Sequence, residues 1–347
     1  MDLIYTGAVN KPGYYPHMEE LGVLHTHTLD LSFGVSENNF ELSLGVHEPD
    51  LQLGGEYEQE KGVFVYIDGT EYGGIVDGVK TNSATGSRSY FGRTWHGLLN
   101  NSVLLESLTV TNVDANQAIA LFLNNLNCLH WCFFGDEVLL SGIHISSYTF
   151  PRFTRGYDGL VKMLRKYGAK LKITVHDIVA LVRAEPIVDY TAQAMDSDLL
   201  DLKIERCVHR VNHLICLGSG QGENRMVRHI YAVEPEPGDE LGEAFYEDAV
   251  QSWPQYNDYR NRTEIFDYPN AGDEDELYIA GVEKLIELRA VNRIETDVKE
   301  GTGFEYDIGD IIHGRDTITG NFVREVVTQK IVKINNGVAY VDYKTGV

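Results

Sequence analysis

The stretch KIVKINNGVAYVDY, residues 330–343, decides the fold class of this chain. Two segments rich in Val, Ile and Tyr flank Asn336-Gly337, and this dipeptide between extended segments is typical of a two-residue hairpin turn. The stretch VFVYIDGTEYGGIV, residues 63–76, repeats the pattern around Asp68-Gly69. Both ends of the chain are therefore predicted to consist of antiparallel strands.

The rest of the sequence supports a mainly β chain. Glycine is abundant, at 34 residues, and proline is scarce, at 9, which suits many tight turns between strands. Further extended segments are predicted at 29–33, 39–44, 87–91 and 169–175, together with a long one from Leu202 to Leu217.

Three helices are predicted between these strands. After Asp114, apolar residues recur with helical spacing up to Leu126, and Asp114 with Gln117 fits a capping box. A second helix begins at Thr154 and ends at Gly168, which can adopt the left-handed conformation.

The third helix is expected around 277–291. The acids Asp273–Glu276 at its start and Arg289 near its end complement the helix dipole.

The fold class that follows is α+β, mainly β, with three domains. We expect a first β-barrel-like domain at 1–105 and a mixed α/β domain at 106–200. A second β-barrel-like domain at 201–347 carries a helical insertion at about 241–300. The polar, acidic stretch 234–248 is predicted to be an exposed loop that leads into this insertion.

Charge excludes several function classes. The 347 residues include 29 Lys and Arg against 52 Asp and Glu, a formal charge of −23. Such a chain lacks the clustered cations that grip duplex DNA or anionic membranes. No run of about 18 apolar residues or secretion signal is present, so synthesis in a cytoplasm is expected.

Cysteine and histidine invite a metal interpretation, which the spacing does not favour. On an extended segment Cys207, His209 and His213 would share one face, but they match no zinc-finger or ribbon pattern. His25 and His27 have the same weakness. We predict structural or surface histidines, no metal site, and buried free thiols at the four cysteines Cys128, Cys132, Cys207 and Cys216.

The glycines Gly218, Gly220 and Gly222 resemble a phosphate loop only superficially. The residues that follow alternate like a strand, whereas a phosphate loop must lead into a helix. A loop within a β-hairpin is therefore predicted, with no cofactor.

Catalytic motifs are also missing from the sequence. No G-x-S-x-G elbow occurs, and Cys132 lacks a papain-like context. The pairs Asp307/Asp310 and Glu264/Asp267 could serve acid–base chemistry, but 52 acids produce such pairs by chance. The run Asp273–Glu276 has no calcium-loop spacing. No catalytic residue and no enzyme activity are predicted.

Several phrases together resemble a known family. LDLSFGVSENNFELSL (29–44), EYGGIVDGVK (71–80), FGRTWHGLLNNSVL (91–104), RVNHLICLGSGQGENR (210–225) and the closing segment 306–337 look like tail-tip, or baseplate hub, proteins. These are proteins of phages and prophages of Gram-positive bacteria. Within the best-matching phrases stand Arg93, Trp95, His96, Asn212 and His213, for which we expect structural roles.

The resemblance implies a fold and an assembly. The fold would be that of contractile-tail hubs such as the one of phage Mu, with two barrel-like domains joined by mixed α/β domains. Three chains would form a ring whose six barrels continue the hexameric symmetry of the tail. Because the chain ends at Val347, shortly after the last hairpin, no lytic domain is expected.

The implied function is that of a structural virion protein at the tail tip, made in the cytoplasm of the bacterial host. Its partners would be two further copies of itself, a distal tail protein and other tail-tip or fibre proteins. Acidic side chains would line a channel through which DNA passes without specific binding. Two alternatives stay open: a cell-wall hydrolase with paired carboxylates, and a saccharide-binding receptor module that uses the abundant aromatic side chains.

Overall fold

The protein is described by a computed structural model. The described residues are 2–9, 17–25, 27–45, 47–48, 51, 61–84, 87–127, 132–136, 139–177, 179–190, 195–196, 201–205, 207, 209–220, 222–233, 245–247, 259, 261–269, 271–289, 293–299, 306–315, 318, 320, 322–335 and 337–345. The chain forms two compact units, Met1–Lys203 with Ile294–Thr345, and Ile204–Arg293. The three-domain division expected from the sequence stays a prediction.

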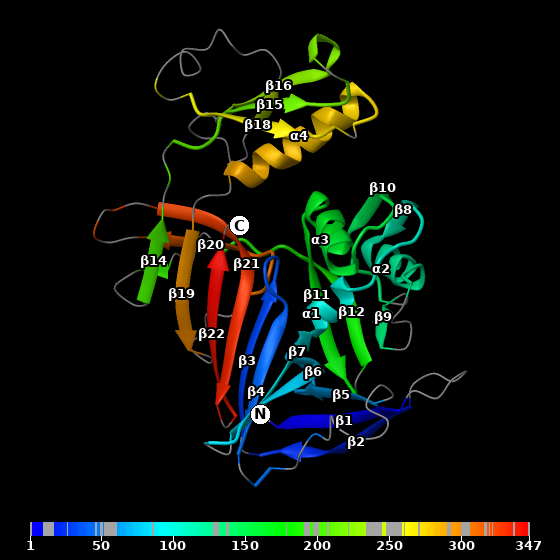
Figure 1. Cartoon of the computed structure of the whole chain (residues 1–347), viewed down its shortest axis with the longest axis vertical. Helices are drawn as coiled ribbons and strands as arrows, with labels where there is room; N and C mark the ends of the chain where they lie inside the picture. Colours follow the sequence, from blue (N-terminus) through cyan, green and yellow to red (C-terminus); the bar gives the residue numbers. More distant parts are fainter. Residues whose placement is uncertain are drawn as a thin grey trace. The chain divides into compact units, whose positions relative to one another are not determined.

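One large curled sheet dominates the first unit (Figure 1). Its strands, so far as they lie in the described ranges, are β1 (Leu3–Val9), β2 (His17–Leu24), β3 (His27–Gly34), β4 (Asn39–Leu44), β5 (Lys61–Tyr66), β6 (Gly73–Asn82), β7 (Ser87–Thr94), β13 (Met195–Asp196), β14 (Asp201–Glu205), β19 (Arg293–Lys299), β20 (Ile311–Arg315), β21 (Phe322–Asn335) and β22 (Val338–Thr345). The main path runs β14-β19-β22-β21-β3-β4-β7-β6-β5-β1-β2, and β20 pairs with β21 and β13. The prediction of an α+β, mainly β fold is confirmed.

The two ends of the chain meet within this sheet. β21 pairs antiparallel with β3 from Gln329 opposite Gly34 to Asn335 opposite Thr28. In Figure 1 the red C-terminal strands accordingly lie beside the blue N-terminal ones. Alternation places Leu29, Leu31 and Phe33 on the buried face of β3, where each is almost fully inaccessible.

Both predicted hairpins form, but with different loops. Asn335 lies opposite Val338, which leaves the predicted two-residue loop at 336–337. β5 and β6 pair only from Tyr66 opposite Gly73, so Asp68-Gly69 lies inside a six-residue loop. The two-residue turn predicted there is wrong because Ile67 and Tyr72 close the loop through one hydrogen bond of 3.0 Å and do not extend the ladder.

A helix-containing part of the first unit packs beside the large sheet. It consists of α1 (Trp95–Asn100), β8 (Leu108–Asp114), α2 (Ala115–Asn124), β9 (Phe133–Gly135), β10 (His144–Phe150), α3 (Gly156–Lys166), β11 (Ala169–His176) and β12 (Val179–Pro186). β8 pairs with β10, while β11, β12 and β9 form a second small sheet. The helices α2 and α3 pack against this second sheet and share one apolar core with it, to which Phe122, Leu160 and Ile173 belong.

The helix signals in this part are mostly confirmed. The Asp114 side chain caps α2, and Gln117 completes the capping box. Gly168 follows α3 with φ of 68°. The sequence prediction missed α1, a six-residue helix that begins after the N-cap Thr94 in the middle of an apolar phrase.

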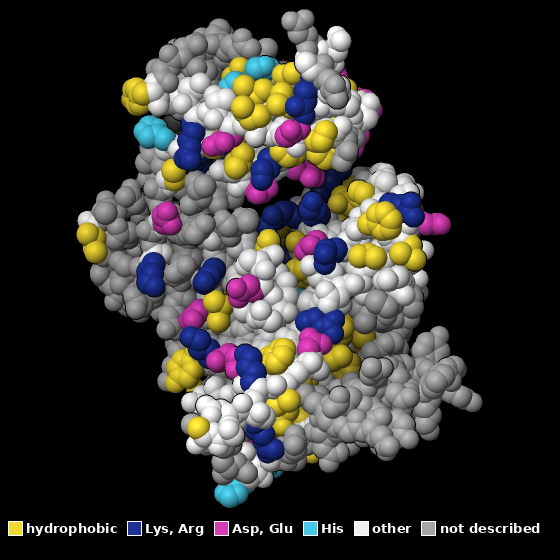
Figure 2. Space-filling view, in the orientation of Figure 1, with side chains coloured by type: hydrophobic (Ala, Val, Ile, Leu, Met, Phe, Trp, Pro, Cys, Tyr) yellow, Lys and Arg dark blue, Asp and Glu magenta, His cyan; other side chains and the backbone are white. Residues whose placement is uncertain are grey.

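The second unit is a small sheet covered by one helix. Its elements are β15 (His213–Leu217), a 3-10 turn at Gly222–Asn224, β16 (Val227–Val233), β17 (Phe245–Glu247), β18 (Thr263–Asp267) and α4 (Glu274–Arg289). The strand order is β17-β16-β15-β18. Leu214 and Ile230 from the sheet pack against Leu277 and Leu285 of α4. On the surface of this unit, Figure 2 shows hydrophobic side chains gathered beside histidines.

Two predictions for this unit need correction. The continuous extended segment 202–217 is wrong: β14 ends at Glu205, and residues 209–212 form no strand before β15 begins at His213. The last helix spans 274–289 in place of the expected 277–291, because Asp273 caps it by accepting a hydrogen bond from the Glu276 amide at 2.8 Å. The stretch 234–244 of the predicted acidic loop lies outside the described residues.

The prediction of buried free thiols is confirmed for Cys132 and Cys216 and is wrong for Cys207. Cys132 and Cys216 are buried free thiols, whereas Cys207 is a free thiol that is partly exposed. Cys128 lies outside the described residues. Within the described ranges, no helix combines the length and the apolar character that crossing a membrane requires.

Candidate functional site

A cluster of buried charges joins the large sheet of the first unit to its helix-containing part. On β21, the Lys330 ammonium donates a hydrogen bond to Glu71 Oε1 at 2.8 Å and lies 3.8 Å from Asp307 Oδ1. It also lies over the rings of Tyr72 and Tyr343, 5.8 and 6.0 Å from their centroids. The side chains of Lys330 and Glu71 are only 8% and 10% exposed, so this ion pair is shielded from water.

The second half of the cluster comes from β11 and the turn before β20. Lys170 donates to both carboxylate oxygens of Asp310 at 2.8 Å and to Asp307 at 3.1 Å. Lys172 donates to the other oxygen of Asp307 at 2.6 Å. Three lysines thus meet three acids, and their formal charges cancel. We call these six residues, Glu71, Lys170, Lys172, Asp307, Asp310 and Lys330, the charge cluster.

The electrostatics of the cluster keep Glu71 and Asp307 ionised. Burial alone would raise the pKa of Asp307, but Lys172 and Lys330 hold it well below its usual value. The pKa of Glu71 is likewise lowered, because Lys330 and Lys172 outweigh the effect of burial. The sequence offered Asp307 and Asp310 as an acid–base pair, but both carboxylates bind the ammonium of Lys170. The pKa of Asp307 is lowered, whereas a general acid needs a raised pKa.

His96 lies at the edge of the cluster and is itself buried. Its ring stacks on Phe33 with centroids 4.5 Å apart and meets the edge of Tyr157 at 5.2 Å. Its Nε2 atom is 3.8 Å from Glu71 Oε2. Burial lowers the pKa of His96 to about 4, so the ring is neutral at pH 7.

Arg93 and Trp95, which belong to the same sequence phrase as His96 (91–104), also have structural contacts. Arg93 makes a two-pronged ion pair with Asp77 at 2.7 and 2.6 Å. Trp95 is fully buried and stacks on Phe64 with centroids 5.8 Å apart. The phrase therefore marks the junction where β7 turns into α1.

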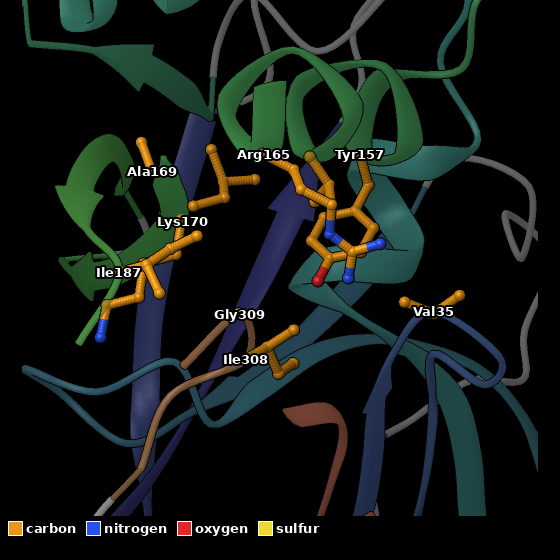
Figure 3. A pocket seen from close by; sticks show the side chains of 10 residues that line it. Val35, Tyr157, Arg165, Ala169, Lys170, Ile187, Ile308 and Gly309 are labelled. Carbon is orange, nitrogen blue, oxygen red and sulfur yellow. The ribbon is translucent and has the colours of Figure 1, made fainter. Parts of the chain in front are cut away.

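A small pocket lies next to the cluster (Figure 3). In Figure 3 the Arg165 side chain lies beside the ring of Tyr157, while Val35, Ile187 and Ile308 supply apolar walls. Among the described residues that line it there is no Asp, Glu, His, Ser or Cys. Lys170 is the only amine among them, and three carboxylate contacts hold that amine. The described lining residues thus offer no arrangement for nucleophilic catalysis.

In the second unit His213 pairs with His229, whereas Cys207 and His209 lie outside the strand. Cys207 Sγ approaches the His209 carbonyl at 3.5 Å, outside any strand. In β15, His213 Nδ1 bonds Thr263 Oγ1 at 2.9 Å and His213 Nε2 bonds His229 Nδ1 at 3.0 Å. The shared strand face expected for Cys207, His209 and His213 is wrong because the chain bends out of the strand before β15.

Asn212 and Asp267, two further candidates, have ordinary structural contacts. Asn212 accepts from the Arg262 amide at 2.9 Å, and Asp267 forms an ion pair with Arg225. His27 is buried in β3, whereas His25 is exposed. No group of three or more His, Cys, Asp or Glu within the described ranges could hold a metal ion.

The glycine-rich segment is a hairpin loop, as predicted. β15 and β16 pair antiparallel from His213 opposite Tyr231 to Leu217 opposite Val227, and the glycines connect them. The 3-10 turn Gly222–Asn224 is too short to act as a phosphate-binding helix.

Comparison with solved structures decides the fold. A tail protein from Neisseria meningitidis MC58 matches with a TM-score of 0.51 and 14% identity, over 100% of this chain and 97% of that one. The 43 kDa tail protein of prophage MuSo2 from Shewanella oneidensis matches with a TM-score of 0.52 and 11% identity, over 99% and 98%. The chain has a phage tail hub-type fold. Neither a family model nor a curated protein matches the sequence.

Within this tail hub-type fold the charge cluster has a clear structural role. It brings together Glu71 from the loop between β5 and β6, Lys170 and Lys172 from β11, and Lys330 from β21. The cluster was not predicted from the sequence. One signal was available, since Lys330 has the same strand parity as the buried Val332 and Ile334 and so had to point inward.

Proposed function

We propose that the chain is a structural component of a phage or phage-derived tail: a trimeric hub at the tail tip. Three copies adapt the hexameric tail above to the threefold parts below and surround the channel through which DNA leaves. The observation that carries this proposal is the tail hub-type fold over the whole chain.

The charges of the chain support the same role. A net charge of −23 suits a ring around DNA, because acidic walls repel phosphates and let the duplex slide. We propose that part of this charge lines the channel. The partners are then two further copies, a distal tail protein and other tail-tip or fibre proteins, and the protein resides in the virion after synthesis in the host cytoplasm.

The proposal includes the absence of enzymatic activity. A cell-wall hydrolase needs two carboxyl groups with different pKa values that flank the scissile bond. Here Asp307 and Asp310 both bind the ammonium of Lys170, and Asp310 is fully buried. This arrangement favours a structural role for both acids.

Assembly and activity assays on the purified chain test the proposal. We expect a ring-shaped trimer in native mass spectrometry and negative-stain microscopy, and no release of peptidoglycan fragments. A monomer that clears cell walls, and loses this activity in the Asp307→Asn variant, would favour the hydrolase. Binding on a glycan array that a Tyr or Trp substitution abolishes would favour the receptor module.

A further inference from the structure

An exposed phenylalanine in an unusual backbone conformation stands between β10 and α3. Phe153 has φ of 65°, a left-handed value that side chains other than glycine rarely adopt, and 59% of it is exposed. Its amide donates to the Leu104 carbonyl at 2.8 Å, and the Thr154 carbonyl accepts from the Leu104 amide at 3.0 Å. These bonds fix the strained backbone that holds an aromatic side chain at the surface, a combination that points to function.

The neighbours of Phe153 make it part of a patch. The Arg152 guanidinium lies 4.4 Å from the centre of the Phe153 ring, and its Nε donates to the Leu105 carbonyl at 2.9 Å. Leu105 is 53% exposed, and Arg155 is exposed as well. We call Leu105, Arg152, Phe153 and Arg155 the Phe153 patch. Aromatic and arginine side chains around an apolar centre are typical of interface hot spots.

The charge of the patch indicates what covers it. Glu106, next to Leu105 in the chain, is exposed, whereas Asp158, three residues after Arg155, is half-buried, so two exposed arginines stand beside one exposed carboxylate. Across a twofold axis the patch would meet itself, and arginines would face arginines. An acidic surface fits better, and a second copy of a chain with a net charge of −23 supplies one. Such a contact joins two different surfaces of neighbouring copies. A series of these contacts closes into a ring when the rotation from one copy to the next permits it.

The outer face of α4 has the complementary chemistry. Asp275, Ile279, Glu283 and Ile286 follow one another at intervals of four, four and three residues, and therefore share one helix face. Ile279 is 61% and Ile286 49% exposed, and both acids are exposed. The opposite face, with Leu277 and Leu285, already packs on its own sheet. The outer face thus presents two apolar side chains flanked by acids.

We propose that the Phe153 patch of one copy binds the outer face of α4 of the next copy. Phe153 and Leu105 contact Ile279 and Ile286, while Arg152 and Arg155 pair with Asp275 and Glu283. This inference rests on the proposed trimeric hub and names the residues that join its copies.

Two variants of the patch test the contact. Phe153→Asn removes the ring and places a residue that tolerates the left-handed conformation, so the melting temperature stays equal or rises. The double variant Arg152→Glu with Arg155→Glu reverses the charge. In sedimentation over a range of concentrations, we expect the dissociation constant of the oligomer to be at least tenfold higher for both variants than for the wild-type chain.

A charge swap identifies the partner surface. Asp275→Lys with Glu283→Lys weakens association on its own and restores it when combined in one chain with Arg152→Glu and Arg155→Glu. Phe91→Ser is the matched control, since Phe91 is also a partly exposed ring with a cation, Lys80, 5.3 Å from its centre, but lies in β7 without a left-handed φ. This control keeps the wild-type mass of the oligomer.

The outcomes separate this inference from the proposed function. If the wild-type chain forms trimers and both patch variants form them equally well, the contact is refuted and the hub stands. The contact is also refuted, and the hub again stands, if the patch variants stay trimeric but lose binding to another tail protein, or if Phe91→Ser weakens association as much as they do. If the wild-type chain is a monomer at every concentration, both the trimer and the contact fail.

Discussion

Removal of the Lys330 ammonium probes the charge cluster most sharply. In the Lys330→Met variant the apolar stem of the side chain remains, while Glu71 loses the cation 2.8 Å from its Oε1 atom. Glu71 is 10% exposed, so water cannot replace that cation. Removing one partner of a buried pair costs about 3–5 kcal/mol, because the other charge stays buried and uncompensated.

Urea denaturation followed by circular dichroism measures this loss. We expect Lys330→Met to lower the free energy of unfolding by about 3–5 kcal/mol and the double variant with Glu71→Gln to regain more than half of it. The matched control is Lys80→Met: Lys80 and Glu41 form a pair that is 60% and 48% exposed, so its loss costs about 1 kcal/mol or less. A Lys330→Met loss no larger than that of Lys80→Met would refute the reasoning.

Three further predictions concern stability. Burial lowers the pKa of His96 from 6.5 to about 4, so between these pH values the unfolded chain binds a proton that the folded chain does not. The contribution of His96 therefore lowers the free energy of unfolding by about 3 kcal/mol from pH 6.5 to pH 4. His96→Phe reduces this loss in urea titrations at both pH values. Asp114→Ala removes the α2 cap, which also accepts from the Ser141 amide at 3.0 Å, and lowers the unfolding free energy by about 1–2 kcal/mol; an unchanged urea midpoint would contradict this role. A Cβ at Gly135 would lie 2.6 Å from the Ala120 Cα atom, so Gly135→Ala costs about 1–3 kcal/mol by thermal unfolding.

Features set by a few neighbouring residues were predictable from the sequence. The turn at 336–337 follows from Asn-Gly between extended segments, and the cap at Asp114 follows from an acid with a glutamine three residues later. Gly168 marks the end of α3 for a similarly local reason, since the left-handed conformation suits glycine.

Features that depend on distant residues were not predictable in this way. The pairing of β21 with β3 joins segments about 300 residues apart, and the alternation of either strand does not name its partner. The charge cluster depends on that pairing, because it brings Lys330 next to Glu71. In the second unit, alternation of residue types predicted one extended segment through 202–217, yet residues 209–212 form no strand, so Cys207 and His213 do not share one strand. Tertiary contacts override local pattern in each of these places.

The mass of the purified chain in native mass spectrometry tests the central claim most directly. A trimer of the 39.0 kDa chain has a mass of 3 × 39.0 = 117 kDa. The account predicts this mass, with ring-shaped particles of threefold symmetry in micrographs of the same sample. A species of 39.0 kDa that persists at every concentration would contradict the claim that this chain forms a trimeric tail hub.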